Sequence, residues 1–287
     1  MVAPIRGHTQ ERDTTNSNAI LDLVAASPIA ASRKDRDMWL GLFDGDARIE
    51  DPAGSVPFTA VNPDRSIGLF YDIFIAHSNI SFIAEEDYVC GRYVVRDGVI
   101  IVDMTEGQRL NIPVFLWYEV SGAGKIKSLR AHWKPGQTLL RALNRRPGGF
   151  GYLTSFGKQL YRSAGFGGIS GFAQAVIPAA IGSRVTLLRL KEYLARGRYY
   201  EAVSLFSFLE GSQIILYSKT AKVYPAGYLT MGEFKILSVE KLIEGGPFLA
   251  FRCEVSLSEY TRTGVAILTL SAAGFRIRKL EVFLKEE

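Results

Sequence analysis

The first half of the chain begins with helical patterns and continues with strand patterns. Two short helices are expected between Ala25 and Phe43, and Ile67 to His77 is almost entirely apolar over a helix length. Runs rich in β-branched and aromatic residues follow, and they predict strands over 79–82, 87–95, 99–104, 110–120 and 125–133. Helices followed by a meander of strands are typical of an α+β fold.

Turn residues separate the predicted segments. A short strand is expected to end at Asp51, with a turn built on Pro52 and Gly54. Further turns are predicted at Arg96-Asp97-Gly98, at Glu106-Gly107 and over 122–124.

The second half repeats this order. Residues 187–209 are predicted to form helices and 212–227 a strand and turn, with strands over 234–239, 248–257, 264–270 and 275–284. The closing strands of the two halves align, with Ile126 over Ile277 and Leu129 over Leu280. Two copies of one fold are the simplest interpretation.

This repeat divides the chain into four parts. Residues 1–20 are polar and are expected to form a flexible tail, and 21–134 and 184–287 are the two domains. The intervening 135–183 is rich in glycine but also basic and apolar, so a helical linker that packs on something is expected.

Composition is that of an ordinary globular protein, with 47% apolar and 22% charged residues. The polar start is unlike a secretory signal, and the weakly polar stretch 165–182 is too interrupted to cross a bilayer, so a cytoplasmic protein is expected. Cys90 and Cys253 lie in strand-like runs and are expected to be buried thiols.

Charge is unevenly distributed, because no Asp or Glu lies between Glu119 and Glu192. This basic region could be a solvated surface, or it could contact an anionic membrane through 135–191, where basic residues alternate with apolar ones. A nucleic-acid partner is not expected, since no strand face carries stacking aromatics beside basic residues.

Motifs for cofactors and metals are not evident. The histidines His8, His77 and His132 are scattered without metal-ligand spacing, and the glycine-rich segments match no phosphate-binding loop. Neither a cofactor nor a metal is therefore expected.

Asp51, in the segment ARIEDPAG, carries a family resemblance. Together with the helix WLGLF before it and the closing strand KIKSLRAHW, it makes residues Ala25 to Trp133 resemble the ketosteroid isomerase and SnoaL-like branch of the NTF2-like superfamily. The resemblance implies two cone-like domains, each a curved mixed or antiparallel sheet wrapped by helices around an apolar pocket. It also implies sheet-to-sheet pairing, either within the chain or in a homodimer.

The same resemblance implies roles for individual residues. Asp51 takes the position of the family's general base, although an Asp could instead simply cap the turn that follows. The family's oxyanion-stabilising Tyr and second Asp fall at about Ser27 and Leu116, neither of which can act in their place. Tyr71 and Asp103 are the candidate substitutes. The side chains expected to line the pocket are Trp39, Phe70, Leu116, Tyr118 and Trp133.

Two functions are compatible with this pattern. The first is a cofactor-independent isomerase, or a related cyclase or dehydratase, that moves a proton beside the carbonyl of an apolar small molecule. The second is a non-catalytic protein that binds a lipid-like or other small molecule in the same pocket, with the linker helices either covering the mouth of the pocket or docking on a membrane. In the second copy about Tyr217 takes the place of Asp51, so that domain is expected to be non-catalytic.

Overall fold

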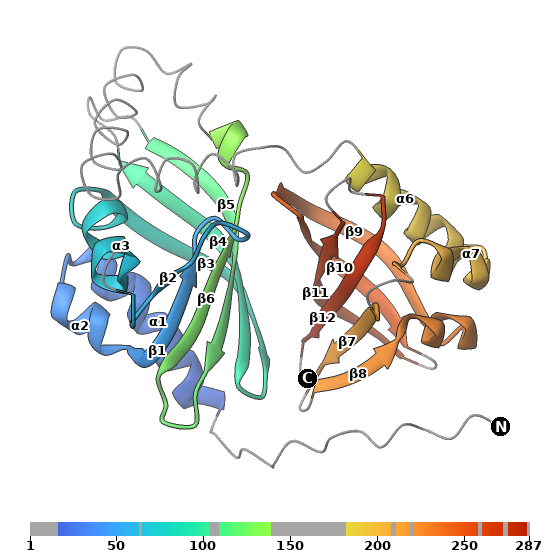
Figure 1. Ribbon diagram of the computed structural model, residues 1–287, viewed down its shortest axis with the longest axis horizontal. Helices are drawn as coiled ribbons and strands as arrows, with labels where there is room; N and C mark the ends of the chain where they lie inside the picture. The colour runs from blue at the N-terminus through green and yellow to red at the C-terminus, as the bar shows by residue number, and fades with distance from the viewer. Residues whose placement is uncertain are drawn as a thin grey trace.

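The computed structural model describes residues 17–62, 65–103, 109–138, 182–207, 211–218, 221–257, 260–271 and 275–285. Two six-stranded mixed sheets, each packed with helices, make up this part of the chain (Figure 1). This arrangement confirms the predicted α+β fold and fits two NTF2-like domains. The predicted helical linker and its membrane contact fall mainly on residues 139–181, outside the described residues, and stay predictions.

The first domain places three helices before most of its sheet. Its elements are α1 (Ser17–Ser32), α2 (Arg36–Gly41), β1 (Phe43–Glu50), β2 (Phe58–Thr59), α3 (Ile67–Phe74), β3 (Asn79–Cys90), β4 (Tyr93–Asp103), β5 (Arg109–Val120) and β6 (Ile126–His132). The strand order is β2-β1-β6-β5-β4-β3. Strands β1 and β6 are parallel, and the other neighbours are antiparallel.

The second domain repeats the topology. Its elements are α6 (Gly182–Ala195), α7 (Tyr199–Ser204), β7 (Gln213–Tyr217), β8 (Ala221–Pro225), the 3-10 helix η3 (Ala226–Met231), β9 (Phe234–Gly245), β10 (Phe248–Leu257), β11 (Tyr260–Leu270) and β12 (Ile277–Leu284). The order β8-β7-β12-β11-β10-β9 matches the first sheet strand for strand, and β7 and β12 form the parallel pair. The two halves are therefore copies of one fold.

Polar caps determine where the short helices of the first domain begin. The Asp35 side chain accepts a hydrogen bond from the Met38 amide at 3.0 Å, and Ser66 accepts one from the Leu69 amide at 3.0 Å. Each bond satisfies an amide that has no partner inside its own helix. Helix α1 begins earlier than the sequence pattern indicates, at Ser17, inside the segment expected to be a tail.

The predicted turn at Arg96-Asp97-Gly98 is wrong. These residues lie within β4 and pair with both neighbouring strands, and the chain instead turns after β3 at Gly91, which has a φ of 58°. Their charges are compensated inside the structure: Arg96 Nε donates to Asp87 at 2.8 Å, and Asp97 binds cations from the second domain. These charged residues therefore remain in a buried strand because Asp87 on the paired strand and cations of the second domain neutralise them.

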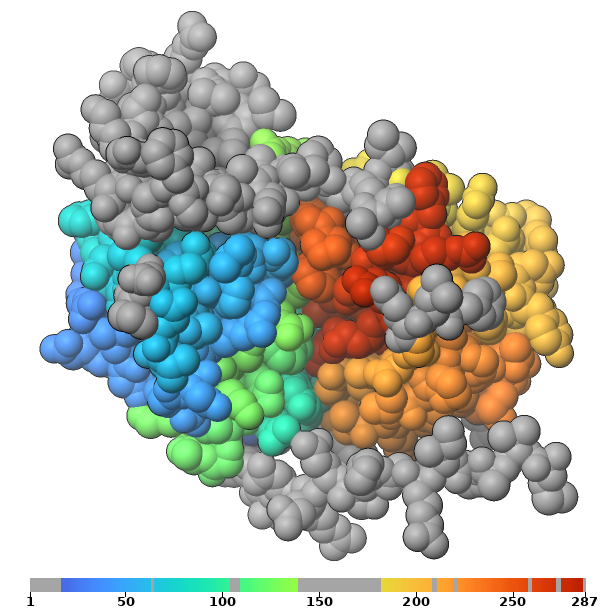
Figure 2. Space-filling model, viewed as in Figure 1, coloured from blue at the N-terminus to red at the C-terminus, as the bar shows by residue number. Residues whose placement is uncertain are grey.

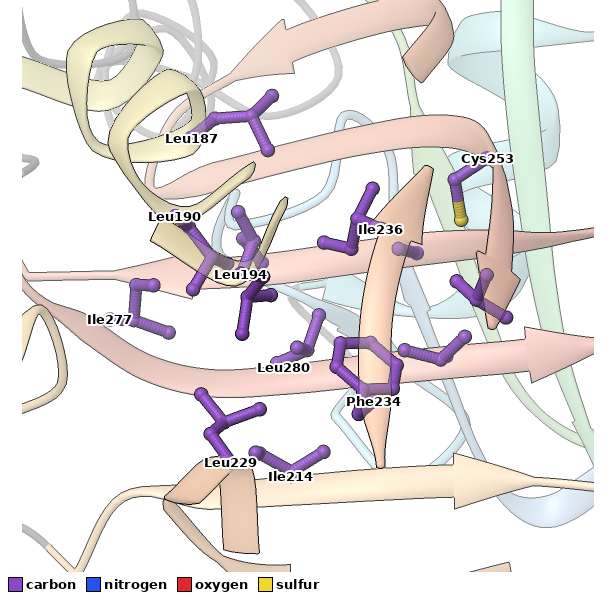
Figure 3. Close-up of a cluster of buried hydrophobic side chains, with 14 of the residues drawn as sticks. Leu187, Leu190, Leu194, Ile214, Leu229, Phe234, Ile236, Cys253, Ile277 and Leu280 are labelled. Carbon is purple, nitrogen blue, oxygen red and sulfur yellow. The ribbon is translucent and has the colours of Figure 1, made fainter. Parts of the chain in front are cut away.

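Each domain has its own core between its sheet and its helices. In the first, buried residues of α1, α2 and α3 pack against the first sheet. In the second, Leu187, Leu190 and Leu194 of α6 and Phe234 and Ile236 of β9 belong to one buried hydrophobic cluster (Figure 3).

A third cluster joins the domains, because the faces of the two sheets that carry no helices pack on each other. Phe115 and Trp117 of the first sheet and Val265, Ile267 and Phe283 of the second are buried in it. The two domains abut in the space-filling view (Figure 2). The predicted sheet-to-sheet pairing is thus made within one chain.

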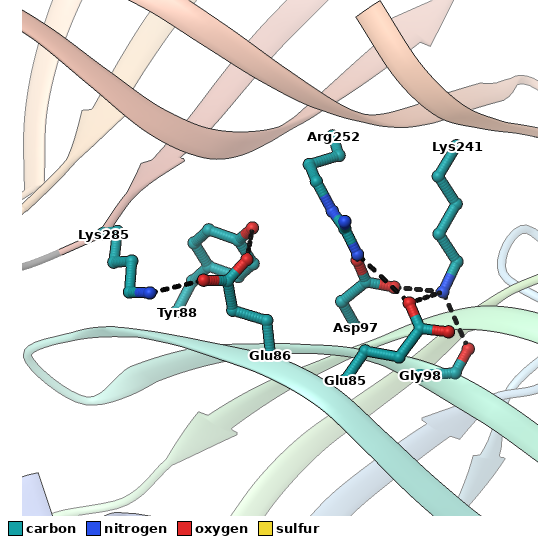
Figure 4. A network of polar contacts seen from close by, with 8 residues as sticks. All are labelled: Glu85, Glu86, Tyr88, Asp97, Gly98, Lys241, Arg252 and Lys285. Atoms are coloured by element: carbon teal, nitrogen blue, oxygen red, sulfur yellow. Dashed lines mark hydrogen bonds and ion pairs between the residues drawn. The ribbon is translucent and has the colours of Figure 1, made fainter.

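Ion pairs flank this interface (Figure 4). Asp97 is fully buried and accepts hydrogen bonds from Lys241 and Arg252 of the second domain. The same two cations reach Glu85, at 3.0 Å from Lys241 Nζ and 3.1 Å from Arg252 Nη2. Because a charge is costly to bury alone, this network favours one relative placement of the two sheets.

Candidate functional site

A cavity of about 190 Å³ opens between the helices and the sheet of the first domain. Its wall is predominantly apolar, built from α1, α3 and the strands that curve around them. The residues that line it are Ser27, Pro28, Ala31, Trp39, Asp51, Phe70, Phe74, Ile75, Ser78, Ile80, Ser81, Phe82, Ile100, Val102, Leu110, Ile112, Leu116, Tyr118, Leu129, Trp133 and Thr138. All five side chains expected to line a pocket are on this wall.

Asp51 is the carboxylate on the cavity wall. It follows β1 directly, and strand alternation places Ile49 and Asp51 on the inner side and Glu50 on the other. Glu50 accepts hydrogen bonds from Arg48 Nη2 at 2.6 Å and from the Gly54 amide at 3.1 Å. The turn after β1 is therefore held by Glu50, which leaves the half-buried Asp51 carboxylate available to the cavity.

Trp133 is the hydrogen-bond partner of this carboxylate. Its indole Nε1 donates to Asp51 Oδ1 at 2.7 Å. Burial disfavours the charged carboxylate and raises the pKa of Asp51 from 3.8 to about 6, although the bond from Trp133 lowers it. A carboxylate with this pKa is mostly ionised at neutral pH, yet it is a stronger base than an exposed Asp.

Tyr118 of β5 lines the same cavity. Burial raises its pKa to about 12, while the charge of Arg96 and a hydrogen bond with the Ser27 side chain lower it. The phenol therefore keeps its proton at neutral pH and can donate a hydrogen bond. The negative charge of Asp51 also raises the pKa of Tyr118, which indicates an electrostatic interaction between the two groups.

The two residues expected to assist Asp51 lie elsewhere. Tyr71 is buried in the core beside Trp39, with ring centroids 5.4 Å apart, and is not part of the cavity wall. Asp103 forms an ion pair with Arg109, Nε to Oδ1 at 2.8 Å, and its side chain is 46% exposed. The structure thus brings neither Tyr71 nor Asp103 to Asp51.

Tyr118 was expected only to line the pocket, and its interactions with Ser27 and Asp51 are the feature that sequence reasoning missed. The available signal was the two-residue spacing from Leu116, because residues two apart on a strand share a face. Its link to Ser27 joins two chain segments distant in sequence, and a linear pattern does not show such a contact.

The second domain has an aliphatic residue where the first has Asp51. In the parallel pair of the first sheet Ile49 lies opposite Leu129, and in the second sheet Ile214 lies opposite Leu280. Asp51, two residues after Ile49, therefore corresponds to Leu216 rather than to Tyr217. Leu216 is buried in the second core, and Tyr217 points to the domain interface, where its ring stacks on Phe283.

Other kinds of site find little support in the described residues. Within those ranges, no three His, Cys, Asp or Glu side chains gather where they would hold a metal ion. No helix in the described part of the chain is long and apolar enough to span a bilayer.

Solved structures of ketosteroid isomerase, SnoaL-like and NTF2-like proteins match the N-terminal half of the chain. A Mycobacterium tuberculosis protein in complex with estradiol-17beta-hemisuccinate is 26% identical over 40% of this chain and 93% of its own, with a TM-score of 0.34. The Delta 5-3-ketosteroid isomerase of a Mycobacterium species is 23% identical over 40% of this chain and 92% of its own, with a TM-score of 0.35.

A third match is SalBIII, an epoxide hydrolase/cyclase-like enzyme of pyran ring formation in the polyether salinomycin. It is 17% identical over 41% of this chain and 92% of its own, with a TM-score of 0.37. No protein-family model matches the chain, and no curated protein matches it.

Proposed function

We propose that the first domain is a cofactor-independent enzyme of the isomerase or lyase kind, which moves a proton beside the carbonyl of an apolar small molecule. The observation that carries the proposal is Asp51, a carboxylate on the wall of an apolar cavity with a pKa of about 6. General bases work best when their pKa lies near the operating pH, and burial gives Asp51 that property.

Asp51 acts as the base in this reaction. Its ionised carboxylate takes a proton from the carbon next to the carbonyl. The electron pair of that C–H bond forms a new C=C bond, and the π pair of the C=O bond moves onto oxygen, which gives an enolate. The C=O bond then re-forms. In an isomerase the protonated Asp51 gives its proton to another carbon of the conjugated system, and in a lyase a group on the next carbon leaves with its bonding electrons. Trp133 holds the carboxylate in one orientation through its 2.7 Å hydrogen bond.

Tyr118 stabilises the enolate in this mechanism. A base removes such a weakly acidic proton only when donors meet the developing oxygen charge in a dry site. Tyr118 lies on the cavity wall, and its hydroxyl remains protonated and interacts electrostatically with Asp51. It takes the role that the sequence analysis expected of Tyr71 or Asp103.

Hydrogen–deuterium exchange beside the carbonyl of model cyclic enones tests this function. Wild-type protein should replace the enone hydrogen next to the carbonyl with deuterium. Asp51→Asn should abolish this exchange while the fold remains intact. Tyr118→Phe should lower the rate by about 100-fold, the usual cost of one oxyanion donor. Asp103→Asn is the matched control and should leave the rate unchanged. Equal rates in wild type and Asp51→Asn would refute the proposal.

A second candidate function is a non-catalytic binding protein for a lipid-like ligand. It is favoured by Ser27 and Leu116, which line the cavity where the resembled enzymes have their oxyanion donors. A binding protein would retain an apolar ketone equally well in wild type and Asp51→Asn, and neither would exchange deuterium. The exchange assay together with a binding titration therefore separates the two functions.

A further inference from the structure

A turn of the second domain touches the loop that carries Asp51. This β9–β10 turn, residues 245–248, lies so close to Trp133 that a Cβ added at Gly245 would come within 2.8 Å of the Trp133 carbonyl oxygen. On the other side of the turn, a Cβ at Gly54 would meet Pro247 Cδ at 3.0 Å and Phe248 Cε2 at 3.1 Å. A side chain at Gly245 would force the Trp133 backbone to shift, and one at Gly54 would press Pro247 and Phe248 away by a few tenths of an ångström.

Phe248 adds an aromatic contact to this approach. Its ring meets the ring of His132 edge-on, with centroids 5.3 Å apart, and His132 directly precedes Trp133. The turn is itself held by its own sheet, since the Leu270 amide donates to the Pro247 carbonyl at 2.8 Å. The second domain thus presents a turn, fastened to its own sheet, to the strand end that precedes Trp133.

The Asp51 loop is held by the first sheet on its other side. The Ala53 amide donates to the Ala131 carbonyl at 2.8 Å, and the Gly54 amide donates to Glu50 Oε2 at 3.1 Å. The loop 51–54 and the end of β6 therefore lie between their own sheet and the turn of the neighbouring domain. Movement of the loop or of the strand end would change the distance between the Asp51 carboxylate and the Trp133 indole N–H.

We propose that the β9–β10 turn of the second domain is a positioning element for the site, which keeps Trp133 in hydrogen-bond contact with Asp51. Its residues touch neither the cavity nor a reacting group, so they act through Trp133 and through the loop 51–54. This inference rests on the proposed function of Asp51, but its test requires no turnover.

Gly245→Ala is the substitution that tests the contact. The φ of Gly245 lies outside the left-handed region, so alanine is conformationally acceptable and the added methyl acts only by pushing on Trp133. Gly227→Ala is the matched control, because a Cβ at Gly227 meets nothing within 4 Å and its φ is also ordinary. Phe248→Ala tests the same element by removing a contact instead of adding one.

Two NMR signals report the result. The ¹³C carboxyl shift of Asp51, assigned with Asp51→Asn, gives its pKa, and the Trp133 indole N–H signal gives the state of the hydrogen bond. Because that bond favours the ionised carboxylate, its weakening in Gly245→Ala and Phe248→Ala should raise the pKa of Asp51 by at least about 0.5 pH unit and move the indole signal. Gly227→Ala should match wild type in both signals.

Unchanged Asp51 and Trp133 signals in a folded Gly245→Ala variant would overturn the inference. If Gly245→Ala does not fold, Phe248→Ala decides by the same two signals. A wild-type protein that exchanges no deuterium beside a carbonyl would end the proposed function, whereas the titrations would still decide whether the second domain positions Trp133.

Discussion

Replacement of Trp133 by phenylalanine removes one hydrogen-bond donor from Asp51 and keeps an aromatic ring on the cavity wall. In the structure the indole Nε1 lies 2.7 Å from Asp51 Oδ1, a short bond to a group that is charged at neutral pH. This bond lowers the pKa of Asp51, while burial raises it to about 6. Trp133→Phe removes the bond that opposes the effect of burial, so the pKa of Asp51 should rise.

The size of this rise follows from the energy of the bond. A hydrogen bond to a charged group contributes about 1.5 to 3 kcal/mol, and about 1.4 kcal/mol corresponds to one pH unit. The pKa of Asp51 in Trp133→Phe should therefore be about 7 to 8. At pH 7 its ionised fraction falls from about nine-tenths to between about one-half and one-tenth, and base-dependent exchange should fall about 2- to 10-fold.

The assay is the ¹³C titration of Asp51 in both proteins, together with deuterium exchange measured from pH 5 to 9. In Trp133→Phe the exchange rate should recover at high pH, because the base is still present and only its titration has moved. Trp39→Phe, which changes another cavity tryptophan without a bond to Asp51, serves as the control. An Asp51 pKa in Trp133→Phe at or below the wild-type value would refute this reasoning.

Three further substitutions test other parts of the structure. The pKa of Asp51 is higher in the folded protein, about 6, than its ordinary 3.8, so the stability this group contributes is full below pH 3.8 and is lost as pH rises through 6. Asp51→Asn should therefore raise the free energy of unfolding by about 1 to 3 kcal/mol at pH 8 and by almost nothing below pH 4, measured by urea denaturation; equal effects at both pH values would contradict this. Asp97→Asn removes a negative charge from between two interface cations and should lower the free energy of unfolding by about 2 to 4 kcal/mol in the same assay. The exposed Asp103→Asn should lower it little. Similar losses in the two variants would contradict a buried network. Leu216→Asp should cost more than about 3 kcal/mol in a thermal melt, and a stable variant would mean that the second core is not filled.

Sequence reasoning reached the parts of this protein that local patterns determine. Asp51 at the end of a short strand was expected on a pocket, as were Leu116 and Tyr118 through the family resemblance, and all three line the cavity. Similar apolar patterns in the closing strands of the two halves predicted two copies of one topology. The two sheets indeed have the same strand order.

Contacts between distant segments were beyond that reasoning. Asp97 looks like a turn residue in sequence, because its cationic partners Lys241 and Arg252 lie in the other domain. Tyr71 sits on an apolar helix whose rotation about its axis decides between core and cavity, and packing against Trp39 turns it to the core. The glycine at 245 carries no sequence signal for its role, since the Trp133 carbonyl it approaches is known only from the fold.

The pH dependence of deuterium exchange tests Asp51 most directly, when it is compared with the titration of the same carboxylate. If Asp51 is the base, the exchange rate beside a model enone carbonyl should rise with pH and reach half its maximum near pH 6, at the pKa that the ¹³C signal reports. The rise should vanish in Asp51→Asn. Exchange that persists in Asp51→Asn, or that reaches half-maximum far from the measured Asp51 pKa, would contradict a role for this carboxylate in proton transfer.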